Sequence, residues 1–180
     1  MEHSLQNTMA LLSHTPATLN ALLRDLPEAW TLRNEGVNTM SPFDVIVHLT
    51  HAERTNWMPR VRMILQFGEG KSFEPFDRWG RIQESRNTSI GRQLDDFAAA
   101  REESLRELRG LNLGPEDLER RGQHPALGIV TLSQLLASWT VHDLTHLHQI
   151  SRSMAHQYRE AVGPWEVNLG VLRCAGHSNP

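Results

Sequence analysis

The amino-acid sequence predicts an all-α fold, a four-helix bundle with a short C-terminal helix, and three observations support this prediction. Apolar residues recur at helical spacing along most of the 180 residues, whereas the alternation typical of strands is nearly absent. Capping residues, prolines and glycines divide the chain into four long amphipathic segments. Such helices bury their apolar faces against one another, so a bundle is the expected architecture.

The first long helix is expected to begin at Thr15-Pro16, which has the form of an N-cap followed by proline at the first helical position. The leucines that follow at helical spacing are Leu19, Leu22, Leu23 and Leu26. The preceding stretch from Leu5 to Leu12 is either a separate helix or the same helix bent at Pro16.

The second helix is expected to begin after Ser41, because Ser41 and Asp44 have the spacing of a capping box. It should run to about Phe67 and bend at Pro59. Residues 68–86 then read as a polar loop that carries a few aromatic residues as anchors.

The third helix is expected over about residues 89–108, followed by a short helical turn that starts at residues 114–116. Thr131 and Gln134 form a second capping-box pattern, which opens a fourth helix that can reach about Ala161. Gly163-Pro164 ends that helix and begins the short C-terminal one.

Length and composition are those of a single globular domain over residues 1–180, with 39% hydrophobic and 22% charged residues. A net charge of −3 and a single lysine, Lys71, give no basic patch for nucleic acid. No apolar run approaches the length of a membrane helix, and the N-terminus has no secretory pattern. With one cysteine, Cys174, an intramolecular disulfide is excluded, so a cytoplasmic location is expected.

The most informative motif is the pair His142 and His146, which lie four residues apart in the fourth helix. This spacing stacks two imidazoles on one helix face. His48, in the second helix, is the candidate for a third ligand, and His51 is its main rival. Three histidines leave an open position on a metal for water or substrate, the arrangement of a catalytic site. Zinc, nickel, iron and manganese all accept such ligands. The alternative is that these are partly buried histidines satisfied by local hydrogen bonds.

A helical wheel places two polar side chains on apolar faces. Asp143 falls near the centre of the apolar stripe of the fourth helix, and Arg60 falls near that of the second. An unpaired buried charge is costly, so we expect the two to pair between helices. The same wheel places Trp57 about 180° from His48, which suggests a dimer interface on the first and second helices or packing under the 68–86 loop.

Two segments resemble the DinB-like (DinB/YfiT) superfamily, which is unrelated to the DNA polymerase of the same name. Residues 40–49, MSPFDVIVHL, resemble its second helix, and residues 142–150, HDLTHLHQI, resemble its later histidine motif. Residues 75–78, PFDR, and 163–165, GPW, also fit, so the resemblance spans about residues 15–173.

The resemblance implies a four-helix bundle of unusual connectivity, a divalent metal held by His48, His142 and His146, and a homodimer. Zinc or nickel is the expected metal, with iron or manganese as alternatives. Relatives of known activity include thiol S-transferases, a thiol-dependent isomerase and metal-dependent hydrolases. Met40, Asn56 and His148 depart from the residues common in the family, which leaves the substrate class open.

The predicted function is that of a metal-dependent enzyme in which the metal activates a thiol or a water molecule. Hydrolysis usually needs a general base, and Glu53 lies about 140° from His48 on the wheel. By analogy with the family, and not from spacing, we expect a thiol S-transferase acting on a small molecule with a low-molecular-weight thiol. The alternatives are a hydrolase or a non-enzymatic, stress-related metal-binding or dimerisation module.

Overall fold

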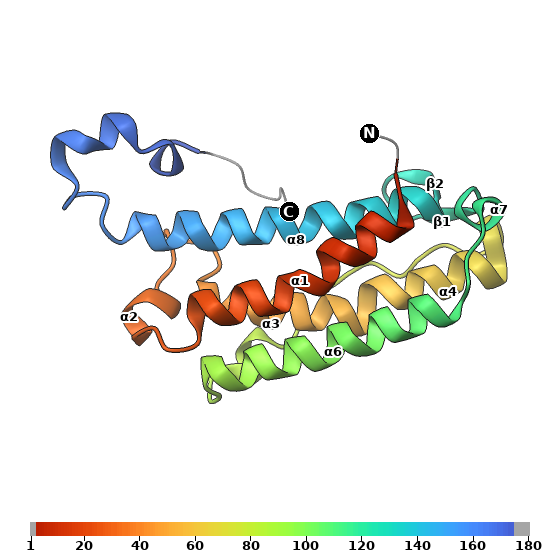
Figure 1. Cartoon of the computed structure of the whole chain (residues 1–180), viewed down its shortest axis with the longest axis horizontal. Coiled ribbons are helices and arrows are strands. Elements are labelled where there is room, and N and C mark those ends of the chain that lie inside the picture. Colours follow the sequence, from red (N-terminus) through yellow and green to blue (C-terminus); the bar gives the residue numbers. More distant parts are fainter. Residues whose placement is uncertain (1–2, 175–180) are drawn as a thin grey trace.

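The computed structural model describes residues 3–174, in which four long helical segments run along a common axis (Figure 1). The segments are α1 (Leu5–Leu23), α3 (Pro42–Ala52) with its continuation α4 (Met58–Phe67), α6 (Ile90–Gly110) and α8 (Leu132–His156). The predicted all-α bundle is therefore confirmed. None of the helices in the described residues combines the length and hydropathy needed to cross a lipid bilayer.

Short elements connect the long helices. They are α2 (Glu28–Thr31), the π-helix η1 (Glu53–Trp57), η2 (Gly68–Gly70), α5 (Ile82–Ser85), α7 (Pro115–Leu118), β1 (Arg121–His124), β2 (Gly128–Thr131), η3 (Gly163–Asn168) and η4 (Gly170–Leu172). The predicted helical turn near residue 115 is present as α7. The fourth helix ends at His156, earlier than the expected Ala161, and the C-terminal helix consists of 3-10 turns.

Capping residues set the beginnings of the long helices. The Ser41 and Thr131 side chains accept hydrogen bonds from the backbone N–H of Asp44 and Gln134, and both predicted capping boxes are complete. The expected start at Thr15 is wrong, because α1 begins after Ser4 and continues through Pro16.

Pro16 is tolerated inside α1 because the carbonyl it leaves without a helical partner finds another donor. A proline has no N–H, so the carbonyl four residues earlier, that of Leu12, loses its helical bond. The Arg101 guanidinium from α6 donates to this carbonyl at 2.8 Å. The helix therefore keeps its course at a position where proline usually ends one.

The second long helix contains one π-helical turn. The segment α3 passes into η1 and then into α4 without a break, with Pro59 in the first turn of α4. A π-helical turn inserts one extra residue and rotates everything that follows by about 100° around the axis. Trp57 therefore points into the protein and is only 4% exposed.

The apolar core falls into two clusters along the bundle. One surrounds Trp139 and Trp57 near the hairpin end, and the other surrounds Phe97 and Ile150 near the opposite end. Between them, at the middle of the helices, lie buried polar residues, among them His48, Glu53, Arg101, Asp143 and His146. The candidate site belongs to this middle layer.

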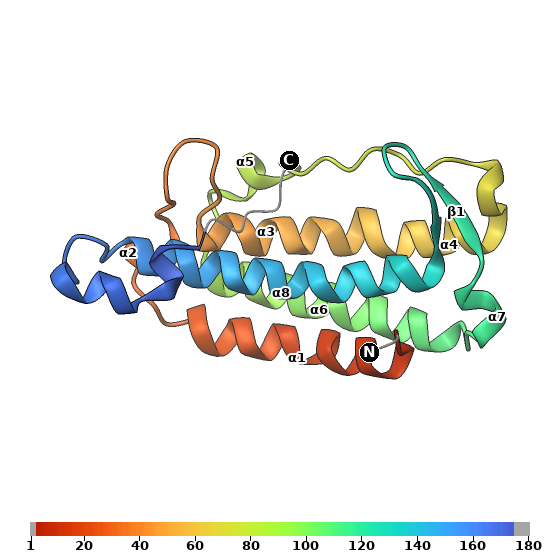
Figure 2. The ribbon, with the colours of Figure 1, turned by 90° about the horizontal axis from the view of Figure 1, so that it is seen from above.

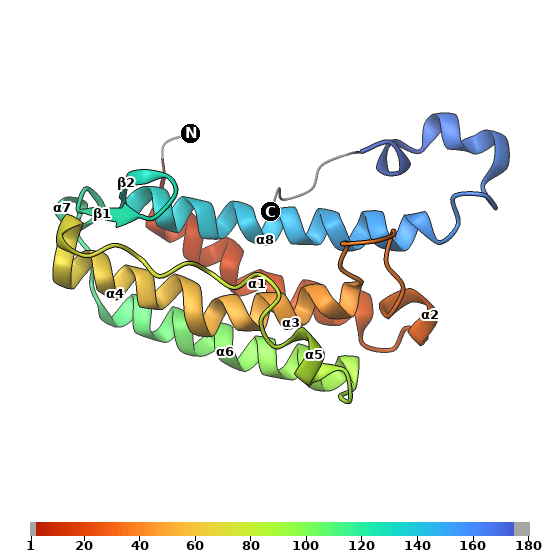
Figure 3. The ribbon, with the colours of Figure 1, turned by 180° about the vertical axis from the view of Figure 1, so that it is seen from behind.

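Two segments close the bundle on the side of α3 and α4. Strands β1 and β2 form an antiparallel hairpin beside the ends of α4 and α8 (Figure 2). The segment from Lys71 to Arg81 runs back along α4 and α3 (Figure 3), and its Phe73 N–H donates to the Gln123 carbonyl of the hairpin. The sequence did not predict the hairpin, whose four-residue strands carry little alternation of apolar and polar side chains.

Candidate metal centre

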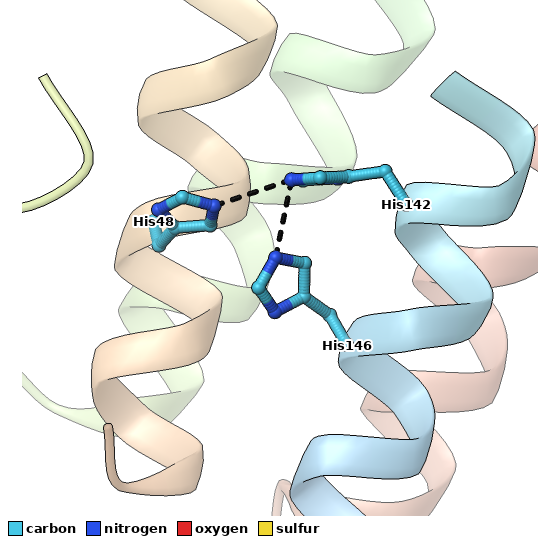
Figure 4. Close-up of side chains that lie close together, drawn as sticks. All are labelled: His48, His142 and His146. Atoms are coloured by element: carbon cyan, nitrogen blue, oxygen red, sulfur yellow. Dashed lines mark hydrogen bonds between the residues drawn. The ribbon is translucent and has the colours of Figure 1, made fainter. Parts of the chain in front are cut away.

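Three imidazoles from two helices meet in the middle layer (Figure 4). His142 Nε2 lies 3.3 Å from His48 Nε2 and 3.1 Å from His146 Nε2. Nitrogens bound to one metal at about 2.0–2.1 Å lie roughly 2.8–3.4 Å apart, for angles between octahedral and tetrahedral. The spacing of these nitrogens therefore fits a shared metal ion.

Hydrogen bonds on the far side of two rings aim their Nε2 lone pairs at this point. His48 Nδ1 lies 2.9 Å from the Arg78 carbonyl, and His146 Nδ1 lies 2.9 Å from Gln149 Oε1. Both partners accept hydrogen bonds, so each Nδ1 carries the proton and each Nε2 is free of one. This is the tautomer that a metal requires of both residues.

His142 is held less tightly than the other two. Its Nδ1 is buried and has no hydrogen-bond partner among the described residues. Its ring packs edge-on against Trp57, at 5.1 Å between centroids. His142 also lines a shallow, open depression of about 520 Å³ whose lining residues all lie on α8, so this ligand is next to the outer face of that helix.

Burial keeps all three imidazoles neutral. It lowers the pKa of His48 to about 4 and that of His146 to about 3, and it lowers the pKa of His142 well below its usual value. The charges of neighbouring histidines would lower the His142 and His146 pKa values further. Three neutral nitrogens with converging lone pairs suit a divalent cation, and the donor set fits zinc or nickel as well as iron or manganese.

His51, the rival for the third position, lies outside the cluster. It is half-buried, stacks on Phe76 at 5.4 Å and has its Nε2 within 3.4 Å of the Thr55 hydroxyl. The three residues brought together are therefore His48, His142 and His146, and their role as metal ligands stays a prediction. His148 is half-buried on another face of α8.

The predicted pairing of Asp143 with Arg60 is wrong. Asp143 is fully buried and forms a two-pronged ion pair with Arg101, with Nη1–Oδ2 and Nη2–Oδ1 distances of 2.6 and 2.9 Å. Arg60 instead lies over the Phe73 ring and donates to the Glu74 carbonyl. Arg101 could not be singled out from the sequence, because it stands in the charged run Arg101-Glu102-Glu103 of α6.

Glu53 completes this second cluster. Its Oε1 accepts hydrogen bonds from Arg101 Nη2 at 2.8 Å and from Trp139 Nε1 at 3.0 Å. Burial raises the pKa of Glu53, an effect that the Arg101 charge opposes. Burial alone would lower the pKa of Arg101, but Glu53 and Asp143 outweigh it and raise that pKa.

The expected position of Trp57 away from the site is also wrong. The π-helical turn brings its ring parallel to that of Trp139, at 5.6 Å, and against His142. A buried Trp57 removes the anchor of the expected dimer surface, and the homodimer itself stays a prediction. The helical wheel failed here because it assumes 3.6 residues per turn throughout.

Two further groups of the site, the Arg78 carbonyl and Gln149, were not predicted from the sequence. The Arg78 carbonyl and Gln149 orient the histidines, and Arg78 reaches His48 from a loop 30 residues away. Gln149 follows His146 by three residues, which is a helical neighbour distance. That spacing is the one signal that could have indicated Gln149.

Comparison with known proteins gives a family match and a structural match. The model of the DinB superfamily matches residues 11–150. No protein of curated function matches the chain. YfiT from Bacillus subtilis, described as a probable metal-dependent hydrolase with an unusual four-helix bundle topology, superposes with a TM-score of 0.71 at 18% sequence identity. The superposition covers 87% of this chain and 86% of YfiT, and at this identity it shows a shared fold.

The family match spans most of the chain and includes His48, His142 and His146. It agrees with the bundle described above and with the position of the histidine cluster between two of its helices. The chain belongs to the DinB superfamily.

Proposed function

We propose that this protein is a metal-dependent enzyme in which His48, His142 and His146 hold a divalent cation. The convergence of three Nε2 atoms carries the proposal, since hydrogen bonds at Nδ1 leave those of His48 and His146 free of a proton. Such a cation supplies Lewis acidity, which lowers the pKa of a bound thiol or water and gives a nucleophile near neutral pH.

The favoured reaction is transfer of a low-molecular-weight thiol to an electrophile. The sulfur forms a bond to carbon, the leaving group departs with its electron pair, and the thiol proton passes to solvent. The Trp57 and Phe76 rings pack against His142 and His48, so apolar walls stand beside the reacting atoms. Glu53, the nearest carboxylate in sequence, is engaged by Arg101 and Trp139, which argues against its use as a general base for water.

Metal-dependent hydrolysis is the second candidate. The observation in its favour is the fold shared with YfiT, a protein described as a probable metal-dependent hydrolase. The same ligands and the same open position would serve a water molecule. Metal binding without activity in the assays below would favour a non-enzymatic metal-binding module.

The first test is metal binding. Equilibrium dialysis of the full chain against zinc, nickel, manganese or iron(II) should give one ion per chain, and His142→Ala should lose it. His148→Ala is the matched control, since this residue lies on the same helix outside the cluster, and it should keep the ion. Equal metal content in the wild type and the His142→Ala variant would refute the site.

The second test separates the two reactions. The metal-loaded protein is assayed with glutathione or cysteine plus 1-chloro-2,4-dinitrobenzene for thiol transfer, and with p-nitrophenyl acetate for hydrolysis. We expect metal-dependent thioether formation that His142→Ala abolishes. Ester cleavage without thioether formation would make the protein a hydrolase and end the transferase assignment.

A further inference from the structure

A second cavity, of about 310 Å³, lies between the hairpin, α4 and α8. Its walls include Trp57, Phe73 and Leu135, all buried. It shares Gln134 and Ser138 with the open depression beside His142, so the two hollows are neighbours on α8. Trp57 joins them from the other side, because its ring lines the cavity and also contacts His142.

One positively charged side chain, Arg60, lines this largely apolar cavity. No carboxylate of the described residues lies within 4 Å of its guanidinium, and neither hollow is lined by an acidic residue. The Arg60 guanidinium donates a hydrogen bond to the neutral Glu74 carbonyl at 3.2 Å. Burial lowers the pKa of Arg60, so its charge is partly removed from water and would gain from an anionic partner.

His124 adds a hydrogen-bond donor to the same cavity. The backbone N–H groups of Ala126 and Leu127 both donate to His124 Nδ1, at 3.1 and 3.2 Å. Nδ1 therefore carries no proton, and the neutral ring keeps its proton on Nε2. Burial lowers the pKa of His124 and the nearby charge of Arg60 lowers it further, so the two residues share one electrostatic environment.

We propose that this cavity binds the carboxylate end of a small, partly apolar substrate. Arg60 pairs with the carboxylate, His124 donates a hydrogen bond, and Trp57 and Phe73 cover the apolar body. The opposite end of the substrate then extends along α8 toward His142. This assignment extends the proposed function. The identification of the His142 end of the substrate as the reacting end rests on that function.

The shape of the cavity agrees with this assignment. Small-molecule sites are mostly apolar hollows of about 300–1,000 Å³ with a few polar groups that fix orientation. A guanidinium presents a planar fork that matches a carboxylate with two parallel hydrogen bonds. The hairpin holds the far wall, and a side chain at Gly122 would clash with Ile64, so the strand packs tightly on α4.

The test is calorimetric titration of the full, metal-loaded chain with 3-phenylpropionate and with its neutral isostere 3-phenylpropanamide. The acid should bind about tenfold or more tightly than the amide, since only the acid can pair with Arg60. Arg60→Gln should weaken the acid by about that factor and leave the amide unchanged, which also shows that the cavity is intact. Arg60→Lys, which keeps the charge, should retain part of the preference.

Arg62→Gln is the matched control, because Arg62 lies two residues away on α4 and pairs with Glu107 at 2.5 Å. It should bind both compounds like the wild type. Equal affinity of the wild type for acid and amide, absence of acid binding, or equal effects of the Arg60 and Arg62 substitutions would overturn the proposal. Tighter binding of phenyl phosphate than of the acid would overturn the choice of a carboxylate.

Repeating the titration after chelation separates this proposal from the metal site. If the acid preference survives chelation, Arg60 and not the metal is the anion partner. If the preference disappears with the metal, the cavity assignment is wrong. A protein that binds no metal in dialysis but keeps the acid preference would lose the proposed function and keep the anion cavity.

Discussion

The middle layer of the bundle contains two buried polar clusters that differ in one respect. In the Arg101 cluster, the positive charge lies among two carboxylates and a carbonyl within 3 Å. In the histidine cluster, three imidazole nitrogens converge instead, and His142 Nε2 lies within hydrogen-bond distance of the Nε2 atoms of His48 and His146. Both clusters take residues from the same turns of α8, since Asp143 lies between His142 and His146. Within the Arg101 cluster opposite charges compensate one another, and in the histidine cluster we propose that a cation plays that part.

The difference follows from which helices enclose each cluster. Arg101 of α6 binds partners on α1, η1 and α8 and is 1% exposed. The histidines come from α3 and α8 and are also contacted by Trp57 of η1 and by the loop that carries Phe76 and Arg78. The Arg101 cluster therefore joins the elements of the bundle to one another, whereas the histidine cluster joins two helices beneath a loop.

The largest effect should come from opening the Arg101 cluster. Arg101→Met leaves Glu53 and Asp143 buried without a counter-charge, and we expect a loss of about 3–5 kcal/mol in the free energy of unfolding. Urea denaturation would measure it. Arg62→Met, which breaks an ion pair that is half exposed, should change stability by no more than about 1 kcal/mol. Similar effects of the two substitutions would contradict the central role of Arg101.

Acid should act mainly on the histidine cluster of the metal-free protein. The pKa values of His48 and His146 are about 4 and about 3 when folded, against about 6.5 unfolded, so below pH 6.5 the unfolded chain binds more protons. Between pH 6.5 and 5 the stability should fall by roughly 3 kcal/mol for the two residues together. Denaturation at each pH would measure this. The double variant His48→Leu, His146→Leu should flatten the dependence, and an unchanged slope would show that other groups titrate.

Chelation should remove stability without removing the fold. A metal present at 100 times its Kd stabilises the native state by about 2.7 kcal/mol, and this contribution disappears with the ion. The two apolar clusters do not depend on the site, so helicity measured by circular dichroism should persist. Loss of the helical signal on chelation would show instead that the metal is needed for folding.

The smallest effect should come from the residue that orients a ligand. Gln149→Leu replaces the acceptor for His146 Nδ1 with an apolar side chain of similar size. Metal affinity should therefore fall about 10- to 100-fold. Competition with a fluorescent zinc chelator would measure the affinity. Gln157→Leu, near the end of α8, serves as the control. Equal affinity in both variants would mean that Gln149 does not set the tautomer.

The contrast between the clusters also explains what sequence reasoning could reach. The spacing of His142 and His146 and the two capping boxes are local helical features, and they were predicted correctly as such. Arg101 and Arg78 contact partners that lie 42 and 30 residues away in sequence, so these contacts depend on how distant segments pack together. Trp57 was misplaced because one π-helical turn changes the rotation of all later residues. Regular periodicity is therefore readable from sequence, while its interruptions and the long-range contacts are not.

The proline within α1 has a consequence for how the helices are aligned lengthwise. A helix without free carbonyls can slide along its neighbour at modest cost, whereas α1 carries one at Leu12 that only Arg101 of α6 satisfies. A shift of one turn, about 5.4 Å, would bury that carbonyl without a donor at a cost of about 1–3 kcal/mol. The carbonyl that Pro16 leaves without a helical donor and the Arg101 guanidinium that binds it thus hold α1 in one axial position relative to α6. Pro16→Ala should leave the bundle folded but allow α1 more than one axial position, visible as doubled amide resonances from Leu5 to Leu12.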